Sequence, residues 1–259
     1  MATGKLPLSV VIITKNAASQ LGPCLASVGF AAEIVVVDSG SSDATVALAQ
    51  AAGTNVIVQA WLGFGRQKQF AVNAAKHDWV LCLDADERVT PSLEAGIYSL
   101  FQDLAKLNTA PMTYAFRMPR RNSFLGRWLK HGEGYPDYSL RLFNRNHAAW
   151  SNDEVHETVI TTSQIGTLRG DLLHDSAETI DGYLAKQNRY STLHAQALFD
   201  QGVRVGYSKM LLSPAARFIK FYFLRMGFLD GGAGFAHIVI GCFAAFSKYA
   251  KLIELCRKP

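Results

Sequence analysis

Several features that mark whole classes of proteins are missing from this sequence of 259 residues. Its four cysteines lie far apart and form no C-x-x-C pair, so we expect buried, reduced thiols in a cytoplasmic protein. Nothing near residue 1 resembles a signal peptide, and there is no internal repeat and no low-complexity tract. No segment reaches the ~20 apolar residues of a membrane span, and the nearest, residues 238–246, is too short to cross alone.

Acidic residues are almost absent from the last part of the chain. Residues 204–259 hold nine Lys or Arg against two Asp or Glu, a net charge of +7, whereas residues 1–203 carry −2. The hydrophobic share of 49% and the charged share of 18% exclude a disordered protein and a disulfide-stabilised miniprotein. The length fits one large α/β domain, or one domain with an appendage.

Short aliphatic runs alternate with helical patterns in the first third of the sequence. Runs rich in β-branched residues are typical of parallel strands that are buried on both faces. The expected strands are residues 8–13, 34–37, 55–59 and 79–83, and the expected helices are residues 17–28, 44–52 and 67–76. The alternation predicts a doubly wound, Rossmann-like sheet that is mostly parallel and flanked by helices.

The pattern changes after the fourth expected strand. A helix over residues 91–107 is expected, and short alternating strands follow over residues 112–175. A long helix over residues 179–201 then leads into the basic, aromatic tail. The predicted division is residues 1–178 for the α/β domain and residues 179–259 for a helical extension.

Polar clusters follow three of the expected strands. They are residues 14–16, 38–43 and 84–87, and each lies at the carboxyl end of its strand. Ligands bind at this edge of an open α/β sheet, because the loops that follow the strands form a crevice there. We therefore expect the three clusters to line one crevice.

Two carboxylates one residue apart, Asp84 and Asp86, stand on the turn after the last of these strands. Such a pair can share a divalent cation, since Mg²⁺ and Mn²⁺ take one or two carboxylates together with phosphate oxygens of a substrate. The alternative is a turn that merely precedes the helix at residues 91–107. The buried strand before the pair and Glu87 after it favour the metal site.

Smaller polar groups at the same edge suit a nucleotide. Asp38 can accept a hydrogen bond from a base N–H or a ribose hydroxyl, and Thr14 and Asn16 can reach a nucleotide edge or stabilise their turn. Arg66 and Lys68 stand at the start of an expected helix, where cations oppose the helix dipole. An anion bound at that terminus would explain them, and solvated side chains are the alternative.

Together these motifs resemble the family 2 glycosyltransferases of GT-A fold. The longer set is similar to bacterial lipopolysaccharide inner-core β-1,4-glucosyltransferases and covers nearly the whole chain. The segments that carry the resemblance are T-K-N at 14–16, V-V-D-S-G-S-S-D at 36–43, L-D-A-D-E at 83–87, Y-P-D at 135–137, R-L-F at 141–143, V-H-E at 155–157 and G-F-L-D-G at 227–231. The resemblance makes residues 1–110 the nucleotide-sugar half and residues 111–178 the acceptor half of one GT-A domain.

The same resemblance implies the substrates and the metal. It implies a UDP-sugar donor, with UDP-glucose as the first candidate, a divalent cation such as Mg²⁺ or Mn²⁺, and inversion at the anomeric carbon. The residues it assigns are Asp38 for the uridine, Asp84 for the ribose or the metal, Asp86 for the metal, Arg141 for the donor, and His174 or His156 as a further metal ligand.

Several acidic residues in the acceptor half are candidates for the general base. An inverting transfer needs one base that takes the proton of the acceptor hydroxyl while the nucleoside diphosphate leaves on the other face. The candidates are Asp137, Asp153, Glu154 and Glu157. Glu157 is favoured because the resemblance centres on its V-H-E tripeptide.

The basic, aromatic tail has two interpretations. It can form two helices that pack on the domain or on a second subunit. It can also form an amphipathic hairpin on an anionic bilayer, which we favour because a lipid-linked acceptor brings an enzyme to a membrane. We expect a protein that is peripheral on the cytoplasmic face of the inner membrane. Nucleic acid is not an expected partner, since no RNA- or DNA-binding motif accompanies the charge.

The predicted function is transfer of a sugar, with glucose as the first candidate, from a UDP-sugar to a lipopolysaccharide core acceptor. Two alternatives use the same fold. One is an enzyme that takes a polyprenyl phosphate as its acceptor, and the other is a membrane adaptor without catalytic activity. A homo-oligomer is compatible with each of them.

Overall fold

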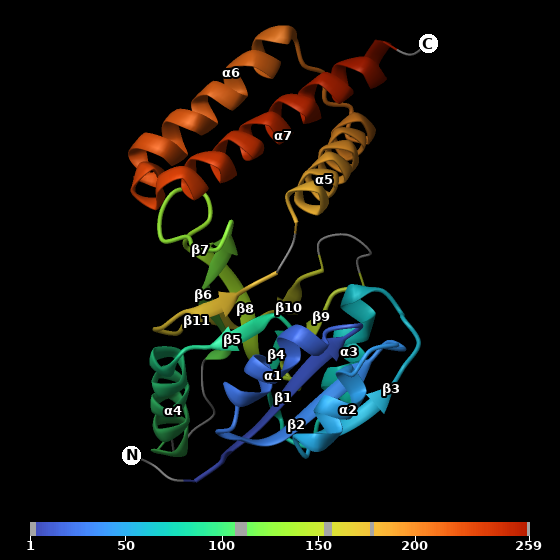
Figure 1. The fold of residues 1–259 in the computed structure, drawn as a ribbon, viewed down its shortest axis with the longest axis vertical. Coiled ribbons are helices and arrows are strands. Elements are labelled where there is room, and N and C mark those ends of the chain that lie inside the picture. The colour runs from blue at the N-terminus through green and yellow to red at the C-terminus, as the bar shows by residue number, and fades with distance from the viewer. Residues whose placement is uncertain (1–3, 107–112, 153–156, 177–178, 258–259) are drawn as a thin grey trace. The chain divides into compact units, whose positions relative to one another are not determined.

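Figure 1 shows a computed structural model of the chain, which describes residues 4–106, 113–152, 157–176 and 179–257. The chain forms two compact units. The first unit comprises residues Met1–Arg120 and Tyr138–His174, and the second comprises Arg121–Asp137 and Asp175–Pro259. The predicted α/β class is confirmed, and the division at residue 178 stays a prediction.

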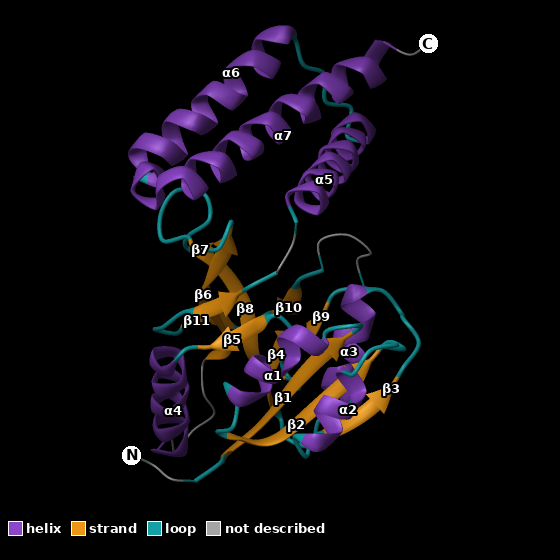
Figure 2. Ribbon diagram, viewed as in Figure 1, coloured by secondary structure: helices purple, strands orange, loops and turns teal. Residues whose placement is uncertain are grey.

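Four parallel strands form the amino-terminal half of the first unit. In space their order is β3-β2-β1-β4, so the chain winds outward from β1 in both directions. They are β1 (Leu6–Thr14), β2 (Ala31–Asp38), β3 (Asn55–Val58) and β4 (Trp79–Asp84), and they alternate with α1 (Ala18–Ala26), α2 (Thr45–Ala51) and α3 (Phe64–Asn73). This is the alternation that the sequence predicts, and Figure 2 shows the helices packed around these strands.

The sheet continues with short strands from the second half of the chain. Beyond β4 its order is β8-β6-β12-β5, and β8 runs antiparallel to β4. The remaining strands are β5 (Glu87–Val89), β6 (Thr113–Phe124), β7 (Arg127–Trp128), β8 (Asp137–Asn144), β9 (Ala148–Trp150), β10 (Val159–Thr161), β11 (Gln164–Thr167) and β12 (Leu172–His174), and the helix among them is α4 (Pro91–Lys106). The expected helix and short strands of this region are therefore present.

The core of the first unit lies on both faces of the parallel strands. Leu8, Val10 and Ile12 of β1 pack in the cluster that α1 and α2 cover, whereas Val11 and Ile13 pack in the cluster that α3 covers. Neither face is open to water, which explains why the strand is continuously aliphatic. The buried sheet therefore fixes where β1 ends, and with it the position of Thr14.

The four cysteines are free, in agreement with the expectation of reduced thiols. Cys24 and Cys82 are buried, and burial raises the pKa of both thiols, that of Cys82 to about 12. The expectation of burial is wrong for Cys242 and Cys256, which are only partly buried because they lie on a helix with a large exposed surface.

Helices dominate the second unit. The expected long helix is present as α5 (Ile180–Asp200). It is followed by α6 (Tyr207–Phe218), the π-helical turn η1 (Ile219–Leu224), the 3₁₀ turn η2 (Gly227–Asp230) and α7 (Gly231–Arg257). Helix α7 packs against both α5 and α6.

One expectation about this unit is wrong. The helical stretch Gly227–Arg257 contains an 18-residue window with a mean hydropathy of 1.5, so it is long and apolar enough to cross a membrane by length and composition. No uninterrupted apolar run of that length is present in this stretch. The glycines, His237 and Ser247 interrupt such a run, yet they lower the mean hydropathy of a long helix only slightly.

Asp230 joins the two chain segments of the second unit. Its carboxylate is 2% exposed and accepts hydrogen bonds from the backbone N–H groups of Lys130, at 2.9 Å, and of His131, at 2.8 Å. The imidazole Nδ1 of His131 lies 3.2 Å from the other oxygen. In addition, Arg217 of α6 pairs with Glu133. These contacts explain why residues 121–137 belong with the C-terminal helices.

We predict that Asp230→Ala destabilises the second unit by about 3 kcal/mol, because hydrogen bonds to a charged group contribute about 1.5–3 kcal/mol each and two backbone donors lose their acceptor. The measurement is urea unfolding followed by tryptophan fluorescence and circular dichroism. The control is Asp103→Ala, whose side chain is 71% exposed and should change the unfolding free energy by less than about 0.5 kcal/mol. Equal midpoints for the two variants would contradict this role of Asp230.

Candidate active site

The ends of β1, β2 and β4 bring the three predicted polar clusters together. Thr14 pairs with Asp38 across β1 and β2, and Ile13 pairs with Asp84 across β1 and β4. All three strands are parallel, so their carboxyl ends lie at one edge of the sheet. The predicted convergence on a single edge is therefore confirmed.

Asp38 is 1% exposed and is surrounded by donors from its own neighbourhood. One carboxylate oxygen accepts from the backbone N–H groups of Gly40, at 3.0 Å, and Ser41, at 2.8 Å, and the other accepts from the Thr14 hydroxyl at 3.0 Å. Burial would raise the pKa of Asp38, but the hydrogen bonds from Ser41, Thr14 and Gly40 together hold it below its usual range. Asp38 is thus a fixed anion at the end of β2.

The structure places two other predicted donor-site residues near the surface. Asn16 has a left-handed backbone, with φ of 51°, and links its own turn to the next one, because its side-chain oxygen accepts from the N–H of Ser42 at 2.8 Å. The contacts of Asn16 are therefore those of a turn-stabilising residue. Arg66 is exposed on the first turn of α3.

Asp84, the first residue of the D-x-D motif, lies between two cations. Its carboxylate accepts a hydrogen bond from Nη2 of Arg141 at 2.7 Å and lies 3.2 Å from Nζ of Lys68. Burial would raise the pKa of Asp84, but Arg141 and then Lys68 more than offset this effect and hold the pKa well below its usual range. Asp84 is therefore ionised throughout the neutral pH range.

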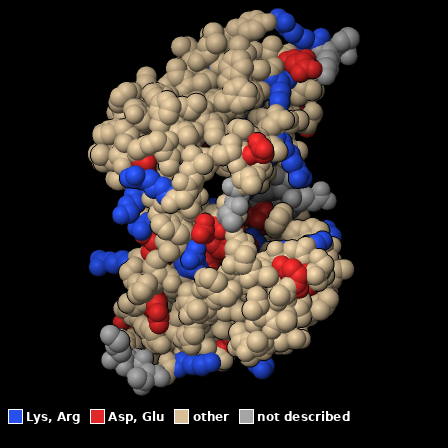
Figure 3. All heavy atoms as spheres, in the orientation of Figure 1, with Lys and Arg blue, Asp and Glu red and all other residues tan. Residues whose placement is uncertain are grey.

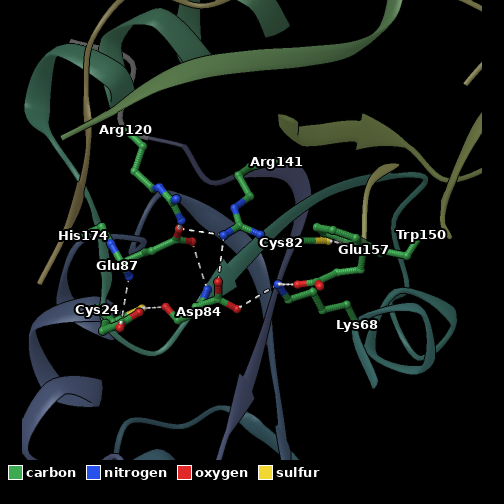
Figure 4. A network of polar contacts seen from close by, with 11 residues as sticks. Cys24, Lys68, Cys82, Asp84, Glu87, Arg120, Arg141, Trp150, Glu157 and His174 are labelled. Carbon is green, nitrogen blue, oxygen red and sulfur yellow. Dashed lines mark hydrogen bonds and ion pairs between the residues drawn. The ribbon is translucent and has the colours of Figure 1, made fainter. Parts of the chain in front are cut away.

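Figure 4 shows that Asp84 is one member of a chain of alternating charges. Glu87 is completely buried, and its Oε1 lies 2.7 Å from Nη2 of Arg141 and 3.4 Å from Nη1 of Arg120. Burial would lower the pKa of Arg141, but Glu87 and Asp84 raise it above its ordinary value. We call the six groups the alternating charge network; its members are Glu157, Lys68, Asp84, Arg141, Glu87 and Arg120.

Lys68 connects this network to the favoured general base. Its Nζ lies 3.2 Å from Oε1 of Glu157, the same distance that separates it from Asp84. The side chain is 6% exposed and lies 4.8 Å from the ring of Trp150. Of the two alternatives for the cations at the start of α3, solvation is therefore wrong for Lys68, which is buried between two carboxylates.

Arg141 retains an unsatisfied donor. Its side chain is 6% exposed, and its Nε has no hydrogen-bond partner among the residues that the structure describes. Buried guanidinium donors are normally all paired, because an unpaired polar group in the interior costs free energy. A phosphate oxygen is the type of acceptor that guanidinium groups bind well.

Asp86 and His174 are the two predicted metal ligands that lie side by side. Strand β12 pairs with β5 so that His174 stands opposite Glu87, and its Nε2 lies 3.3 Å from Oδ2 of Asp86. Among the described residues, no set of three His, Cys, Asp or Glu lies close enough to share one metal ion. A carboxylate and an imidazole fit Mg²⁺ or Mn²⁺ only if phosphate oxygens of a substrate supply further ligands.

The remaining candidates are distributed as follows. Asp153, Glu154 and His156 lie outside the described residues. Asp137 is the first residue of β8. Glu87 and Arg120 belong to the site although their sequence patterns do not identify them as site residues. The available signals were an acidic residue close after a buried strand, for Glu87, and a pair of arginines within a strand, for Arg120.

The sequence is similar to known proteins over most of its length. The family model described as "Glycosyl transferase family 2" matches residues 9–161. The lipopolysaccharide core biosynthesis glycosyltransferase LpsC of Rhizobium meliloti is 33% identical, over 96% of this chain and 93% of LpsC. The uncharacterized glycosyltransferase RP128 of Rickettsia prowazekii is 31% identical, over 97% of this chain and 88% of that protein.

Solved structures show weaker similarity. Residues 1–349 of S. aureus TarS, in complex with UDP-GlcNAc, give a TM-score of 0.48 at 13% identity, over 96% of this chain and 91% of that one. Glucosyl-3-phosphoglycerate synthase from Mycobacterium tuberculosis, with Mn²⁺, UDP and glucosyl-3-phosphoglycerate, gives 0.36 at 22% identity, over 46% and 45% of the two chains.

Gly65 permits the close approach on which the Lys68–Glu157 contact depends. It is buried in α3, and a Cβ atom there would overlap the carbonyl oxygen of Ser151 and lie 3.3 Å from Cβ of Glu157. We predict that Gly65→Ala lowers the unfolding free energy by about 1–3 kcal/mol and reduces activity, because α3 must move away from Ser151 and Glu157. The measurements are thermal melting and nucleotide release.

Gly22→Ala is the matched control for this prediction. Gly22 is exposed in α1, and a Cβ atom there meets nothing within 4 Å. Alanine at this position should leave activity unchanged and change the unfolding free energy by no more than about 1 kcal/mol, because the gain in helix propensity is opposed by crowding against Pro23. The role of Gly65 is refuted if its alanine variant behaves like that of Gly22.

Proposed function

The chain belongs to glycosyl transferase family 2, and from that premise we propose that it transfers a sugar from a UDP-sugar to a lipopolysaccharide core acceptor with inversion at the anomeric carbon. The resemblance derived from its motifs is confirmed at the level of the family. Its relative LpsC is named for lipopolysaccharide core biosynthesis, which supports the proposed acceptor. UDP-glucose is the first donor to test.

The observation that carries the proposal is the position of Lys68. One buried ammonium group contacts Asp84, which belongs to the donor motif, and Glu157, the favoured base. A transferase must hold its donor and its base on either side of one anomeric carbon. The short path from Asp84 through Lys68 to Glu157 supports this arrangement.

The proposed reaction is a single displacement. The acceptor hydroxyl attacks the anomeric carbon, a new glycosidic C–O bond forms, and the bond to the diphosphate oxygen breaks. Glu157 takes the hydroxyl proton, and the electron pair of the broken bond leaves with the nucleoside diphosphate. Lys68 orients Glu157, because its ion pair restricts the rotamers of that side chain.

The donor diphosphate needs cations at this edge of the sheet. Arg141 offers the unsatisfied Nε–H, and Lys68 offers a buried ammonium group. Both lie beside Asp84, which is proposed to contact the ribose or the metal. Thr14 and Asp38 would face the nucleoside, and Arg66 is an exposed cation on the neighbouring helix.

Asp86 and His174 would hold the divalent cation. When bound, the metal neutralises negative charge on the leaving nucleoside diphosphate. The two side chains provide one carboxylate and one imidazole, so the donor's phosphate oxygens would complete the ligand set. Asp84 could join this set only by giving up its contact with Arg141 or Lys68.

The acceptor determines the proposed location. A lipopolysaccharide core is built on a lipid, so the enzyme would work as a peripheral protein at the cytoplasmic face of the inner membrane. Residues 179–259 form the proposed membrane-associating extension of a GT-A domain at residues 1–178. An assay with core oligosaccharide and with polyprenyl phosphate as acceptors separates this proposal from the first alternative, and absence of turnover with both favours the adaptor.

We predict that Glu157→Gln lowers turnover by about 10²–10⁴-fold, because a glutamine cannot accept the hydroxyl proton. The shift in melting temperature that UDP produces should persist, since the donor-side contacts of Asp84 and Arg141 remain. Glu94→Gln, the same change in the first turn of α4, is the control and should leave both readings unchanged. Normal turnover in Glu157→Gln would contradict this assignment and leave Asp153, Glu154 and Asp137 as the candidates for the base.

We also predict that Mn²⁺ and UDP bind cooperatively. Each alone should raise the melting temperature slightly, and the pair should raise it by more than the sum, because stabilisation follows the affinity of each ligand for the folded state. Asp86→Asn and His174→Gln should each remove the cooperative part. A cooperative shift that survives in both variants would contradict the proposed ligands, and Asp103→Asn serves as the exposed control.

A further inference from the structure

Helix α6 and the π-helical turn η1 present apolar side chains to solvent. Residues 212, 216, 219 and 223 follow helical spacing and share one side, and all of them are exposed. Leu212 is 67% exposed, Ile219 54% and Phe223 56%, and Leu224 beside them is 75% exposed. We call this side, made of Leu212, Ala216, Ile219, Phe223 and Leu224, the α6 apolar face.

The opposite side of α6 is apolar as well. Phe218 and Tyr222 stack at 4.9 Å, and both rings contact Phe235 of α7, at 6.2 and 5.8 Å. The helix therefore already has the apolar contact surface that packs it into the second unit. An amphipathic surface helix would be polar on the remaining side, whereas a helix that is apolar on both sides is normally covered on both.

The second unit exposes further apolar residues outside α6. They lie on η2 and the first half of α7, namely Phe228, Leu229, Phe235, Val239 and Phe243. Figure 3 shows a largely uncharged surface over α6 and this part of α7 on the side in view. Many large apolar side chains exposed on one unit indicate a binding surface.

The chain segment that forms the α6 apolar face carries charges of one sign. Residues 201–229 contain five Lys or Arg and no Asp or Glu, and one of the five, Arg217, pairs with Glu133. Lys209 and Lys220 are exposed and lie eleven positions apart, so they line the same edge of the face. Two copies of the chain that met through this face would bring lysines together, whereas an anionic lipid surface would complement them.

We propose that the α6 apolar face is a docking surface for an anionic lipid bilayer, with α6 lying in the plane of the interface. The apolar side chains would enter the boundary between headgroups and acyl chains, and Lys209 and Lys220 would bind phosphate groups of the lipids. This extends the proposed peripheral location to a defined surface of the second unit.

The contacts of α7 favour a second unit that docks on the bilayer over one in which α7 crosses it. Nζ of Lys251 is held by α5, at 2.7 Å from Oδ1 of Asn188, 2.7 Å from Oγ of Ser191 and 2.8 Å from Oγ1 of Thr192. Helix α5 carries charged side chains along its length and cannot enter a bilayer. A spanning α7 would have to leave α5, although by length and composition it could cross.

The test is co-sedimentation of the full chain with vesicles of phosphatidylcholine alone or of phosphatidylcholine and phosphatidylglycerol. We expect binding to the anionic vesicles. The double variant Leu212→Ser/Phe223→Ser should lower the partition coefficient at least about tenfold, because it removes buried apolar surface. Lys209→Gln/Lys220→Gln should lower it about 30-fold, since each lysine near an anionic surface contributes about 1 kcal/mol.

The matched control is Ile160→Ser/Ile165→Ser, which removes two side chains of similar exposure, 60% and 47%, from the first unit. It should sediment like the unmodified chain. Circular dichroism checks that all variants fold, which exposed substitutions should allow. Vesicle binding needs neither donor nor turnover, so a failed transfer assay and a failed docking surface give different results.

Three outcomes would overturn the inference. The first is equal sedimentation of the Leu212/Phe223 variant and the control variant. The second is a dimer in analytical ultracentrifugation that Leu212→Ser/Phe223→Ser dissociates, without vesicle binding by the unmodified chain, which would make the face a contact between copies. The third is retention in the membrane after extraction at alkaline pH, which would identify α7 as a spanning helix.

Discussion

The ion pairs of Asp84 with Lys68 and Arg141 hold three elements of the first unit in place. A charge taken out of water must be paired, and removing one partner of a buried pair costs several kcal/mol. Asp84 ends β4, Lys68 belongs to α3 and Arg141 to β8, so pairing these charges also fixes the positions of the three elements. Glu157 depends on the same lysine. The geometry of the proposed donor site and the position of the proposed base are therefore consequences of one electrostatic constraint.

The sequence predicts the parallel strands and their meeting point well, because both follow from local patterns. Aliphatic runs identify β1, β2 and β4, and parallel register then places Thr14, Asp38 and Asp84 at one edge. The contact between Lys68 and Glu157 could not be predicted, since the two residues are 89 positions apart and no periodicity relates them. Lys68 has the pattern of a solvated lysine at the start of a helix, and only the fold shows that it is buried.

In the second unit, too, local sequence patterns predict helices but not the contacts between distant residues. Its long helix α5 was predictable from periodicity, and α7 was underestimated because glycines interrupt its apolar run. The attachment of residues 121–137 to this unit depends on Asp230, whose partners are backbone N–H groups of Lys130 and His131. Every residue except proline has a backbone N–H group, so the residue types at positions 130 and 131 do not predict this contact.

The charge balance of the site bears on how a donor could bind. The alternating charge network contains three carboxylates and three cations, so in isolation it is formally neutral. A diphosphate placed beside it would add uncompensated negative charge, which a buried site tolerates poorly. A divalent cation at Asp86 and His174 would restore the balance, and the diphosphate would supply the ligands that these two side chains lack. Under the proposed function, a donor that binds together with its metal would therefore suit this network better than either partner alone.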